Sequence, residues 1–343
     1  MRFSDVFGQD HAVGLLQNAL RTGRVHHAYL FVGPAGTGRH DAAWAFAQAL
    51  QCEDSREDAC GRCVPCMKAS RRVHPDIRWV EPAEGRASIG IDQVRAIRSE
   101  VAYGPYEGKY RVYIVTPAEQ LAPEAQNALL KLLEEPPPRT VFVLVAESAH
   151  AVLPTVVSRL QPVRFHLVPA DEIEGMLRTR LGVDPPRARV LATLCGGRVT
   201  LAARWAQTPD ALGDRDRVVA HLLRVEQEGL LAAQKAANEF AGERDRLPEL
   251  LDIALLWYRD LIVWQETGSS RLLVNLDRLD EIRRLAPTLA SGALRRRIEA
   301  IERAKADLRR NLHPRLVLDT MFLQFDRLRE HRPATSATPT QHT

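Results

Sequence analysis

The chain has 343 residues, of which 45% are hydrophobic and 26% are charged, a composition typical of soluble globular protein. This length has room for two or three domains, and the mild excess of basic over acidic residues, 47 against 43, permits contact with nucleic acid without requiring it. No apolar run approaches the roughly 18 residues of a transmembrane helix, and the chain begins without an apolar signal segment. We therefore expect a cytoplasmic protein with no membrane span.

Short apolar runs alternate with amphipathic stretches over residues 1–167. Four of these runs predict strands: AYLFVG (28–33), PDIRWVEP (75–82), YRVYIVT (110–116) and VFVLVAE (141–147). Helical stretches are predicted at 41–50, from about residue 91, and at 123–135, and the segments LPTVVSRL (153–160) and PVRFHL (162–167) follow the last strand. Repeated strand–helix units predict a parallel sheet covered by helices.

The predicted strands stop after Pro169. Residues 171–205 are predicted to form short helices, and residues 215–324 are predicted to be helical because apolar side chains recur at three- and four-residue intervals. The end of the chain is rich in Pro, Ser and Thr, which favours disorder. The expected organisation is an α/β core at 1–167, a small helical domain at 168–210, an all-α domain at 211–330 and a disordered tail at 331–343.

The segment GPAGTGRH, between the first strand and its helix, resembles a phosphate-binding loop of the form G-x-x-x-x-G-K-[ST]. Gly33, Gly36 and Gly38 keep the glycine-rich character, but Arg39 replaces the lysine and His40 replaces the hydroxyl residue. Arg39 is a wider, forked cation, and a neutral imidazole is a poor ligand for Mg²⁺, which prefers oxygen. The segment therefore predicts a degenerate loop that does not function with ATP, although any glycine-rich strand–helix turn can look similar.

A second catalytic position is altered in the same domain. The strand that would carry the metal-binding aspartate of an ATPase, YRVYIVT, ends in Thr116 followed by a proline. Glu119 lies further on, where it is equally explained as an acidic residue in the first turn of a helix. Loss of two independent catalytic positions on a retained scaffold predicts a nucleotide-binding fold that has lost its ATPase chemistry.

Four of the five cysteines, Cys52, Cys60, Cys63 and Cys66, lie within one short segment. In a reducing compartment such a cluster suggests a metal before disulfides, and four thiolates are the number that a closed tetrahedral zinc site uses. The C-x-x-C-x-x-C part also resembles a ferredoxin run, so an iron–sulfur cluster is an alternative, and unmetallated thiols are the plainest interpretation.

Several longer segments occur in an order found in one known family: HHAYLFVGPAGTGRH (26–40), the cysteine segment, GKYRVYIV (108–115), AQNALLKLLEEPP (125–137), TVVSRL (155–160) and NLHPRLVLDTMF (311–322). In these segments the sequence resembles the AAA+ clamp-loader subunits of bacterial DNA polymerase III. The resemblance covers nearly the whole chain except the tail. It implies an α/β AAA+ core of the P-loop type, a small helical lid at 168–210 and an all-α collar at 211–330.

The resemblance also implies roles for single residues. Arg159 matches the arginine that enters the ATP site of a neighbouring subunit as an arginine finger, although the family's Ser-Arg-Cys triplet here ends in Leu160. From the residues alone, an ordinary surface ion pair would be the favoured explanation of Arg159. In the lid, Arg198, Thr200 or Leu201 occupies the position where motor subunits place a nucleotide-sensing arginine.

The implied function is that of a stator subunit without ATPase activity. Its implied partners are the delta and gamma/tau subunits, and the sliding clamp and primed DNA through the assembled loader; its implied cofactor is a structural Zn²⁺ on the four cysteines, with ATP not expected on this subunit. Two alternatives remain: a gamma/tau-type ATPase motor, and a zinc-containing nucleic-acid-binding module. The second would need a concentrated basic patch, and the basic stretch at 294–311 is better explained as a solvated helix face.

Overall fold

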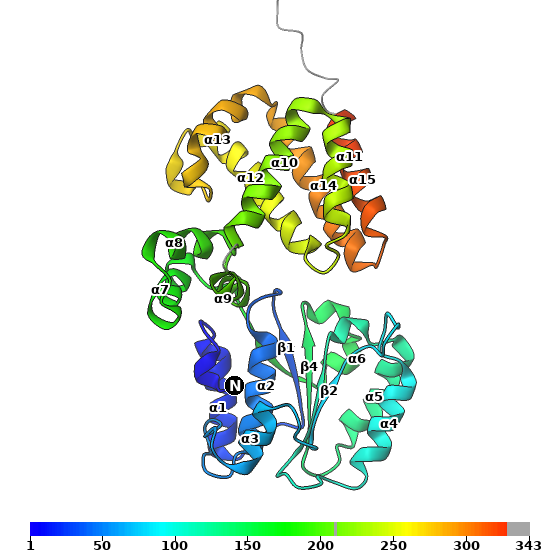
Figure 1. Ribbon diagram of the computed structural model, residues 1–343. Helices are drawn as coiled ribbons and strands as arrows, with labels where there is room; N and C mark the ends of the chain where they lie inside the picture. Colours follow the sequence, from blue (N-terminus) through cyan, green and yellow to red (C-terminus); the bar gives the residue numbers. More distant parts are fainter. Residues whose placement is uncertain (209–210, 328–343) are drawn as a thin grey trace, which may run out of the picture. The chain divides into compact units, whose positions relative to one another are not determined.

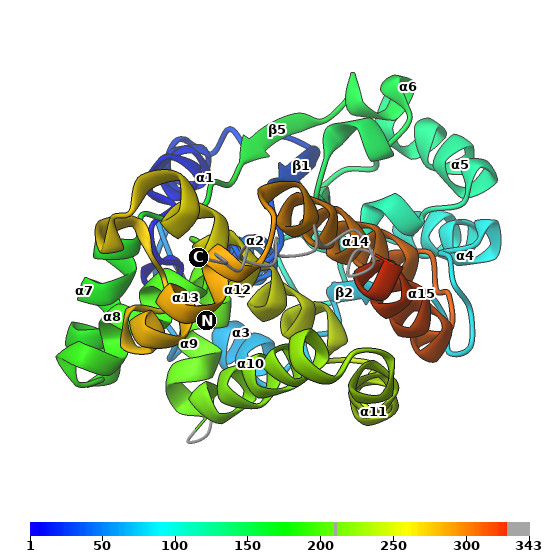
Figure 2. The ribbon, with the colours of Figure 1, turned by 90° about the horizontal axis from the view of Figure 1, so that it is seen from above.

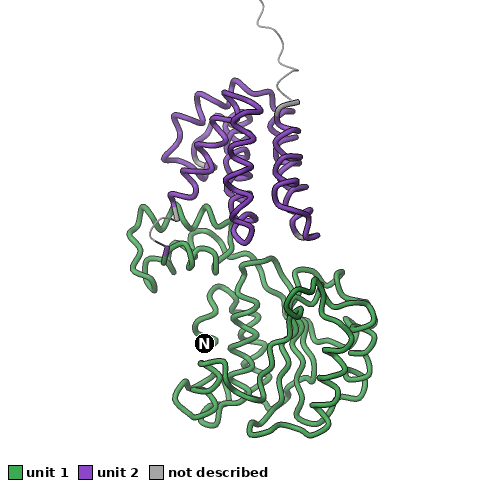
Figure 3. The backbone as a smooth tube through the Cα atoms, turned by 45° about the vertical axis from the view of Figure 1, so that its right-hand side comes forward, with its two compact units in different colours: residues 1–207 green, residues 208–343 purple. Residues whose placement is uncertain are grey.

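The computed structural model describes residues 1–208 and 211–327 and divides into two compact units, Met1–Gln207 and Thr208–Thr343 (Figure 3). The first unit holds both the expected core and the expected lid, and the second holds the expected collar. The bounds of the four expected segments stay predictions, and the tail expected at 331–343 lies outside the described residues.

A five-stranded parallel sheet of order β2-β3-β4-β1-β5 forms the centre of the first unit. Its strands are β1 (Ala28–Val32), β2 (Ile77–Val80), β3 (Arg111–Val115), β4 (Thr140–Ala146) and β5 (Gln161–Arg164). The four strands expected from the apolar runs are confirmed, and β5 pairs with β1 at one edge of the sheet (Figure 2).

Alternate side chains of the strands enter two separate cores, because successive residues of a strand point to opposite faces of the sheet. Tyr29 and Phe31 of β1 pack on the face covered by α1 and α2, whereas Leu30 packs on the face covered by α4 and α5 (Figure 1). Both faces are therefore buried, as is usual for a parallel sheet. The helices around the sheet, on both of its faces, are α1 (Asp10–Thr22), α2 (Arg39–Gln51), α3 (Val64–Ser70), α4 (Ile91–Val101), α5 (Pro123–Glu134) and α6 (Pro154–Val157).

Three further helices complete the first unit: α7 (Ala170–Leu181), α8 (Pro185–Leu194) and α9 (Val199–Gln207). They pack on one another around a small apolar centre that includes Ile173, Leu177 and Leu191. This three-helix group lies where the helical lid is expected, and the Gly196-Gly197 turn precedes α9.

Within its described residues the second unit consists of helices and the loops between them, with no strand, as expected for an all-α domain. Its longer helices are α10 (Ala211–Glu228), α11 (Leu230–Ala241), α12 (Leu247–Thr267), α13 (Leu279–Leu285), α14 (Ser291–Arg309) and α15 (Pro314–Arg327). α12 packs against α14, and both α11 and α14 pack against α15 (Figure 2). Trp257 and Tyr258 lie fully buried in this core.

One charged network is buried inside the same unit. Arg297 is 1% exposed, and its Nε and Nη2 donate to the two carboxylate oxygens of Glu226 at 2.7 and 2.9 Å. The hydroxyl of Tyr258 donates to the same carboxylate at 2.9 Å. Because the guanidinium pairs within the fold, Arg297 is not part of a solvated basic face.

No helix within residues 1–208 and 211–327 combines the length and apolar character that a membrane span requires.

Candidate functional site

The degenerate loop and Thr116, at the end of β3, both lie at the carboxyl ends of the strands. β1, β3 and β4 are parallel and neighbouring, so the segments that follow their carboxyl ends come together. The backbone N–H of Gly33, which follows β1, donates to the carbonyl of Ala146 at the end of β4 at 3.3 Å. This edge of the sheet is where the loop of a working ATPase would face its catalytic acids.

The two positions that would bind Mg²⁺ in an ATPase are hydrogen-bonded to each other here. Nε2 of His40 lies 2.8 Å from the Thr116 hydroxyl, across 76 residues of sequence. The imidazole keeps an exposed edge, yet its pKa is lowered from 6.5, first by partial desolvation and then by the charge of neighbouring Arg39. The pair is therefore neutral near pH 7 and offers Mg²⁺ no carboxylate.

Arg39, at the position of the phosphate-binding lysine, is turned into the protein. The residue is 4% exposed, and its Nη1 donates to the carbonyl of Ala146. Within the described residues its Nε has no hydrogen-bond partner. Burial lowers the pKa of Arg39, and the nearby carboxylates of Glu147 and Glu119 offset part of that effect. The guanidinium is thus hydrogen-bonded to the backbone at the end of β4.

Glu119 joins the ends of two strands. One of its carboxylate oxygens accepts a hydrogen bond from the backbone N–H of Glu147, whereas the other, Oε2, is buried without a partner among the described residues. Glu119 also lies in the first turn of a short 3₁₀ helix (Ala118–Gln120), as the alternative interpretation expected. Its contacts support a structural role between β3 and β4.

The lid touches the degenerate loop through backbone atoms. The N–H of Thr200 donates to the carbonyl of Gly36 at 3.0 Å. Gly36 has φ 78°, and a Cβ at that position would lie 2.8 Å from the Cβ of Arg198, so no larger residue fits without a shift. Arg198 donates from Nε to the carbonyl of Cys195 at 2.9 Å, and Leu201 is buried.

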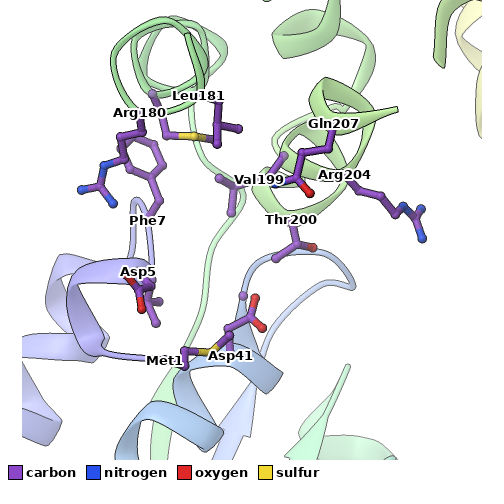
Figure 4. Close-up of a pocket in the computed structure, with 14 residues that line it drawn as sticks. Met1, Asp5, Phe7, Asp41, Arg180, Leu181, Val199, Thr200, Arg204 and Gln207 are labelled. Carbon is purple, nitrogen blue, oxygen red and sulfur yellow. The ribbon is translucent and has the colours of Figure 1, made fainter. Parts of the chain in front are cut away.

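A cavity of about 570 Å³ lies between the loop and the lid, within the first unit. Figure 4 shows Asp41 of α2 and Thr200 of α9 on its facing walls. Arg180 lies near its rim, with its guanidinium carbon 5.3 Å from the centre of the Phe7 ring. Burial raises the pKa of Asp41. The lining of the cavity includes the acidic side chains of Asp5 and Asp41 and the basic side chains of Arg180 and Arg204.

The four clustered cysteines converge in space. The sulfur atoms of Cys52, Cys60, Cys63 and Cys66 all lie within 4.8 Å of one another. Backbone N–H groups point at the sulfurs: Cys60 N lies 3.3 Å from Cys52 Sγ, and Cys63 N lies 3.3 Å from Cys60 Sγ. Such N–H donors favour the thiolate form of the sulfurs that accept them, here Cys52 and Cys60.

The donor set fits a tetrahedral zinc ion. Zn–S bonds of about 2.3 Å place the sulfurs of a tetrahedral site about 3.8 Å apart, and the sulfurs of Cys60 and Cys66 are already 4.0 Å apart. Burial raises the pKa of Cys60, but hydrogen bonds from the N–H groups of Arg62 and Cys63 outweigh it and lower the pKa to about 7. Burial raises the pKa of Cys66 to about 12, a penalty on the thiolate that a bound cation would remove.

The cysteine segment is fastened to the sheet domain at several points. Arg2 donates from Nη2 to the carbonyl of Cys60 at 2.8 Å, and the N–H of Phe3 donates to Asp58 at 3.0 Å. Gln48 donates to the carbonyl of Cys66 at 3.2 Å, and the ammonium of Lys109 donates to the carbonyl of Cys52. The module thus links the start of the chain, the end of α2 and the segment before β3.

Arg159 lies at the amino-terminal ends of the strands, whereas the degenerate loop of the same chain lies at their carboxyl ends. It precedes β5, near His26 and His27 at the start of β1, whereas the loop follows the end of β1. β1 has five residues, so at about 3.3 Å per residue its two ends are about 16 Å apart. Arg159 is therefore remote from the degenerate loop of its own chain.

The guanidinium of Arg159 makes three hydrogen bonds within its own chain. Nη1 donates to the carbonyl of Thr155 at 2.7 Å and to Oγ of Ser158 at 3.3 Å, and Nη2 donates to the carboxylate of Glu134 at 2.7 Å. Both charged side chains are partly exposed, at 36% for Arg159 and 50% for Glu134. Glu134 belongs to the LLEEPP segment that carries part of the family resemblance, but no local pattern identifies its ion-pair partner 25 residues later.

The basic stretch at 294–311 does not form a continuous basic face. Besides the buried Arg297, Lys305 forms an ion pair with the carboxylate of Asp252 at 2.7 Å. Arg295, Arg303 and Arg310 also lie within 4.0 Å of carboxylates, so five of the seven basic residues of the stretch form ion pairs within the unit. This arrangement weakens the nucleic-acid-binding alternative.

Comparison with known proteins gives two family matches that together span most of the chain. The family described as DNA polymerase III, delta subunit, matches residues 8–169, and its C-terminal family matches residues 210–327. The delta′ subunit of Bacillus subtilis is 30% identical over 318 residues, which cover 92% of this chain and 95% of that protein. The chain belongs to the delta′ type of clamp-loader subunits.

Longer relatives are also similar to this delta′-type chain. The tau subunit of Bacillus subtilis is 27% identical over 94% of the chain, and the gamma/tau subunit of Mycobacterium tuberculosis H37Rv is 30% identical over 93%. The chain spans only 61% and 60% of the length of these two proteins. A solved structure of a gamma subunit-related protein from Thermotoga maritima is 20% identical, covering 91% of this chain and 99% of its own, with a TM-score of 0.39. The family assignment and the parallel sheet confirm the expected AAA+ class.

Proposed function

We propose that this delta′-type chain is the non-catalytic stator of a DNA polymerase III clamp loader. In that role it would act in the cytoplasm beside delta and gamma/tau subunits and help to load the sliding clamp onto primed DNA. The observation that carries the proposal is the 2.8 Å hydrogen bond between His40 and Thr116, because it removes both Mg²⁺-binding positions at once. The inward-turned Arg39 supports the same conclusion.

The gamma/tau-type motor is the competing function, and nucleotide binding separates the two. A motor must bind ATP·Mg²⁺ through the loop lysine and the metal ligands. The purified chain is expected to show no saturable binding of a fluorescent ATP analogue in the presence of Mg²⁺. Saturable binding that is abolished by Gly38→Val, together with measurable hydrolysis, would favour the motor.

We further propose that Arg159 acts in trans as an arginine finger. Its support is its position at the sheet edge away from its own loop and its partial solvent exposure. A guanidinium presented to a neighbour's ATP would stabilise the charge that develops on the transferred phosphoryl group. Here Arg159 is a donor to another subunit's site, and the chain itself hydrolyses nothing.

The test is Arg159→Ala in a loader reconstituted from this chain and its partner subunits. Arginine fingers contribute roughly 10³–10⁵ in rate at the site they serve, so the neighbouring site should become nearly silent while other motor sites continue. Arg159→Lys should rescue poorly, because an ammonium cannot form a bidentate fork with phosphate. Steady-state ATP hydrolysis gives the rate, and gel filtration shows whether the complex is intact. Wild-type rates in a fully assembled Arg159→Ala loader would refute the finger.

We also propose a structural zinc ion on Cys52, Cys60, Cys63 and Cys66. Four protein sulfurs leave no open coordination position, so the metal would shape the segment rather than perform chemistry. The support is the convergence of the four sulfurs and the backbone N–H groups directed at them. An iron–sulfur cluster is the alternative occupant, and elemental analysis distinguishes the two metals.

A further inference from the structure

A carboxylate holds the proposed finger in place. Glu134 is the last residue of α5, and its Oε1 accepts a hydrogen bond from Nη2 of Arg159 at 2.7 Å. A carboxylate in the last turn of a helix is repelled by the partial negative charge of the helix carbonyls, so this position does not favour the helix itself. The interaction that compensates Glu134 is its ion pair with Arg159.

The other bonds of the guanidinium also fold it back onto its own chain. Nη1 of Arg159 is bound to the carbonyl of Thr155, one helical turn earlier, and to the hydroxyl of Ser158. All three acceptors thus belong to the segment around α5 and α6, and within the described residues Nε makes no hydrogen bond. A phosphate that takes the guanidinium in a bidentate manner must displace at least part of this set.

We infer that Glu134 is a positioning residue that keeps Arg159 retracted against this chain's own core and competes with a neighbour's phosphates for its guanidinium. This inference rests on the proposed finger function of Arg159. Because Glu134 carries a full negative charge, it is the acceptor that competes most strongly with phosphate; the carbonyl of Thr155 and the hydroxyl of Ser158 are neutral. Removing that charge should therefore make the finger easier to extend.

The expected effect is modest because both side chains are partly exposed. The strength measured for exposed ion pairs corresponds to a factor of roughly 1.5 to 5 in an equilibrium. Glu134→Gln keeps the shape of the side chain and an acceptor oxygen but removes the charge. We expect it to raise ATP hydrolysis at the neighbouring site by about that factor of 1.5 to 5 at low ionic strength. Salt screens the pair, so the ratio of variant to wild type should fall toward one near 0.5 M salt.

The experiment uses a reconstituted loader in which the neighbouring motor is the only subunit able to hydrolyse ATP. Five versions of this chain are compared: wild type, Glu134→Gln, Arg159→Ala, the double variant, and Glu135→Gln as the matched control. Glu135 is the next residue and is exposed, but Arg159 does not bond to it. We expect Glu135→Gln to match wild type and the double variant to match Arg159→Ala, since Glu134 acts only through the guanidinium.

The outcomes separate the inference from the function on which it rests. If Arg159→Ala is slow but Glu134→Gln equals wild type or is slower, the finger stands and the retraction by Glu134 is refuted. If Arg159→Ala equals wild type, the proposed finger fails and the inference fails with it. If Glu134→Gln accelerates hydrolysis equally in the Arg159→Ala background, Glu134 acts by another route and the inference is overturned. Glu134→Asp, which keeps the charge on a shorter stem, should lie between wild type and Glu134→Gln.

Discussion

If the cysteine cluster holds the proposed zinc ion, replacing one of its cysteines should release the ion and loosen one segment while leaving the sheet domain intact. The change is Cys63→Ser, which leaves three sulfurs for an ion that requires four ligands. The purified wild-type chain should carry one zinc per molecule, and the variant should carry almost none. Because the sulfur ligands close the tetrahedron, the loss is expected to be nearly complete rather than proportional.

The magnitude follows from the loop that the proposed zinc ion would close. The cluster joins Cys52 to Cys66, a loop of 15 residues, and a cross-link that closes a loop of this size contributes about 3 kcal/mol. Losing it should raise amide exchange in this loop by roughly 10²-fold, since 1.4 kcal/mol is a factor of ten. The four hydrogen bonds that link the loop to the sheet domain remain, so the loop should become more mobile but stay attached. The core around Phe31 and Phe46 should keep its protection.

Elemental analysis of the purified proteins gives the metal, and hydrogen exchange by mass spectrometry gives the local protection. Cys195→Ser is the matched control, because Cys195 is buried away from the cluster and donates its S–H to the carbonyl of Ala192. It should leave the zinc content unchanged. Iron in the wild-type protein, no metal in a reduced preparation, or a full zinc content with wild-type protection in Cys63→Ser would refute the reasoning.

Two further predictions concern the sheet domain. Arg39→Lys alone should not create ATP hydrolysis, because His40 and Thr116 still bond to each other and leave no Mg²⁺ ligand; a coupled ATPase assay checks this. Asp76→Asn should lower the free energy of unfolding by about 3–5 kcal/mol, since it breaks a buried ion pair with Arg111, and urea unfolding measures the change. Burial raises the pKa of Asp76, but hydrogen bonds outweigh it and lower the pKa below 3.8. The stabilisation is therefore present above pH 3.8 and is lost as the pH falls through the folded value.

Each of these has a control on the same chain. Turnover in Arg39→Lys that survives Gly38→Val would come from a contaminating ATPase, whereas turnover that Gly38→Val abolishes would contradict the prediction. Asp92→Asn is the control for Asp76→Asn, because the Asp92 side chain is 90% exposed and its loss should change stability by less than about 0.5 kcal/mol. A wild-type urea midpoint for Asp76→Asn would contradict the burial argument.

Residue type and short-range spacing by themselves determine much of the chemistry of this chain. The replacement of lysine by Arg39 and of a hydroxyl residue by His40 lies within a single loop, so the sequence alone predicts a loop without ATPase chemistry. The spacing of Cys60, Cys63 and Cys66 likewise brings three thiols close together within a segment of seven residues. The parallel sheet was predictable too, because strand and helix periodicities are local properties of the sequence.

The tertiary structure decided which distant residues meet. His40 and Thr116 bond only because β1 and β3 end at the same edge of one sheet, a consequence of strand order that periodicity does not specify. The partner of Arg159 could not be predicted either, since Glu134 reaches it through the packing of α5 against α6. Local sequence sets the chemistry that each side chain offers, whereas long-range packing of the sheet and its helices determines which of those groups lie within hydrogen-bond distance.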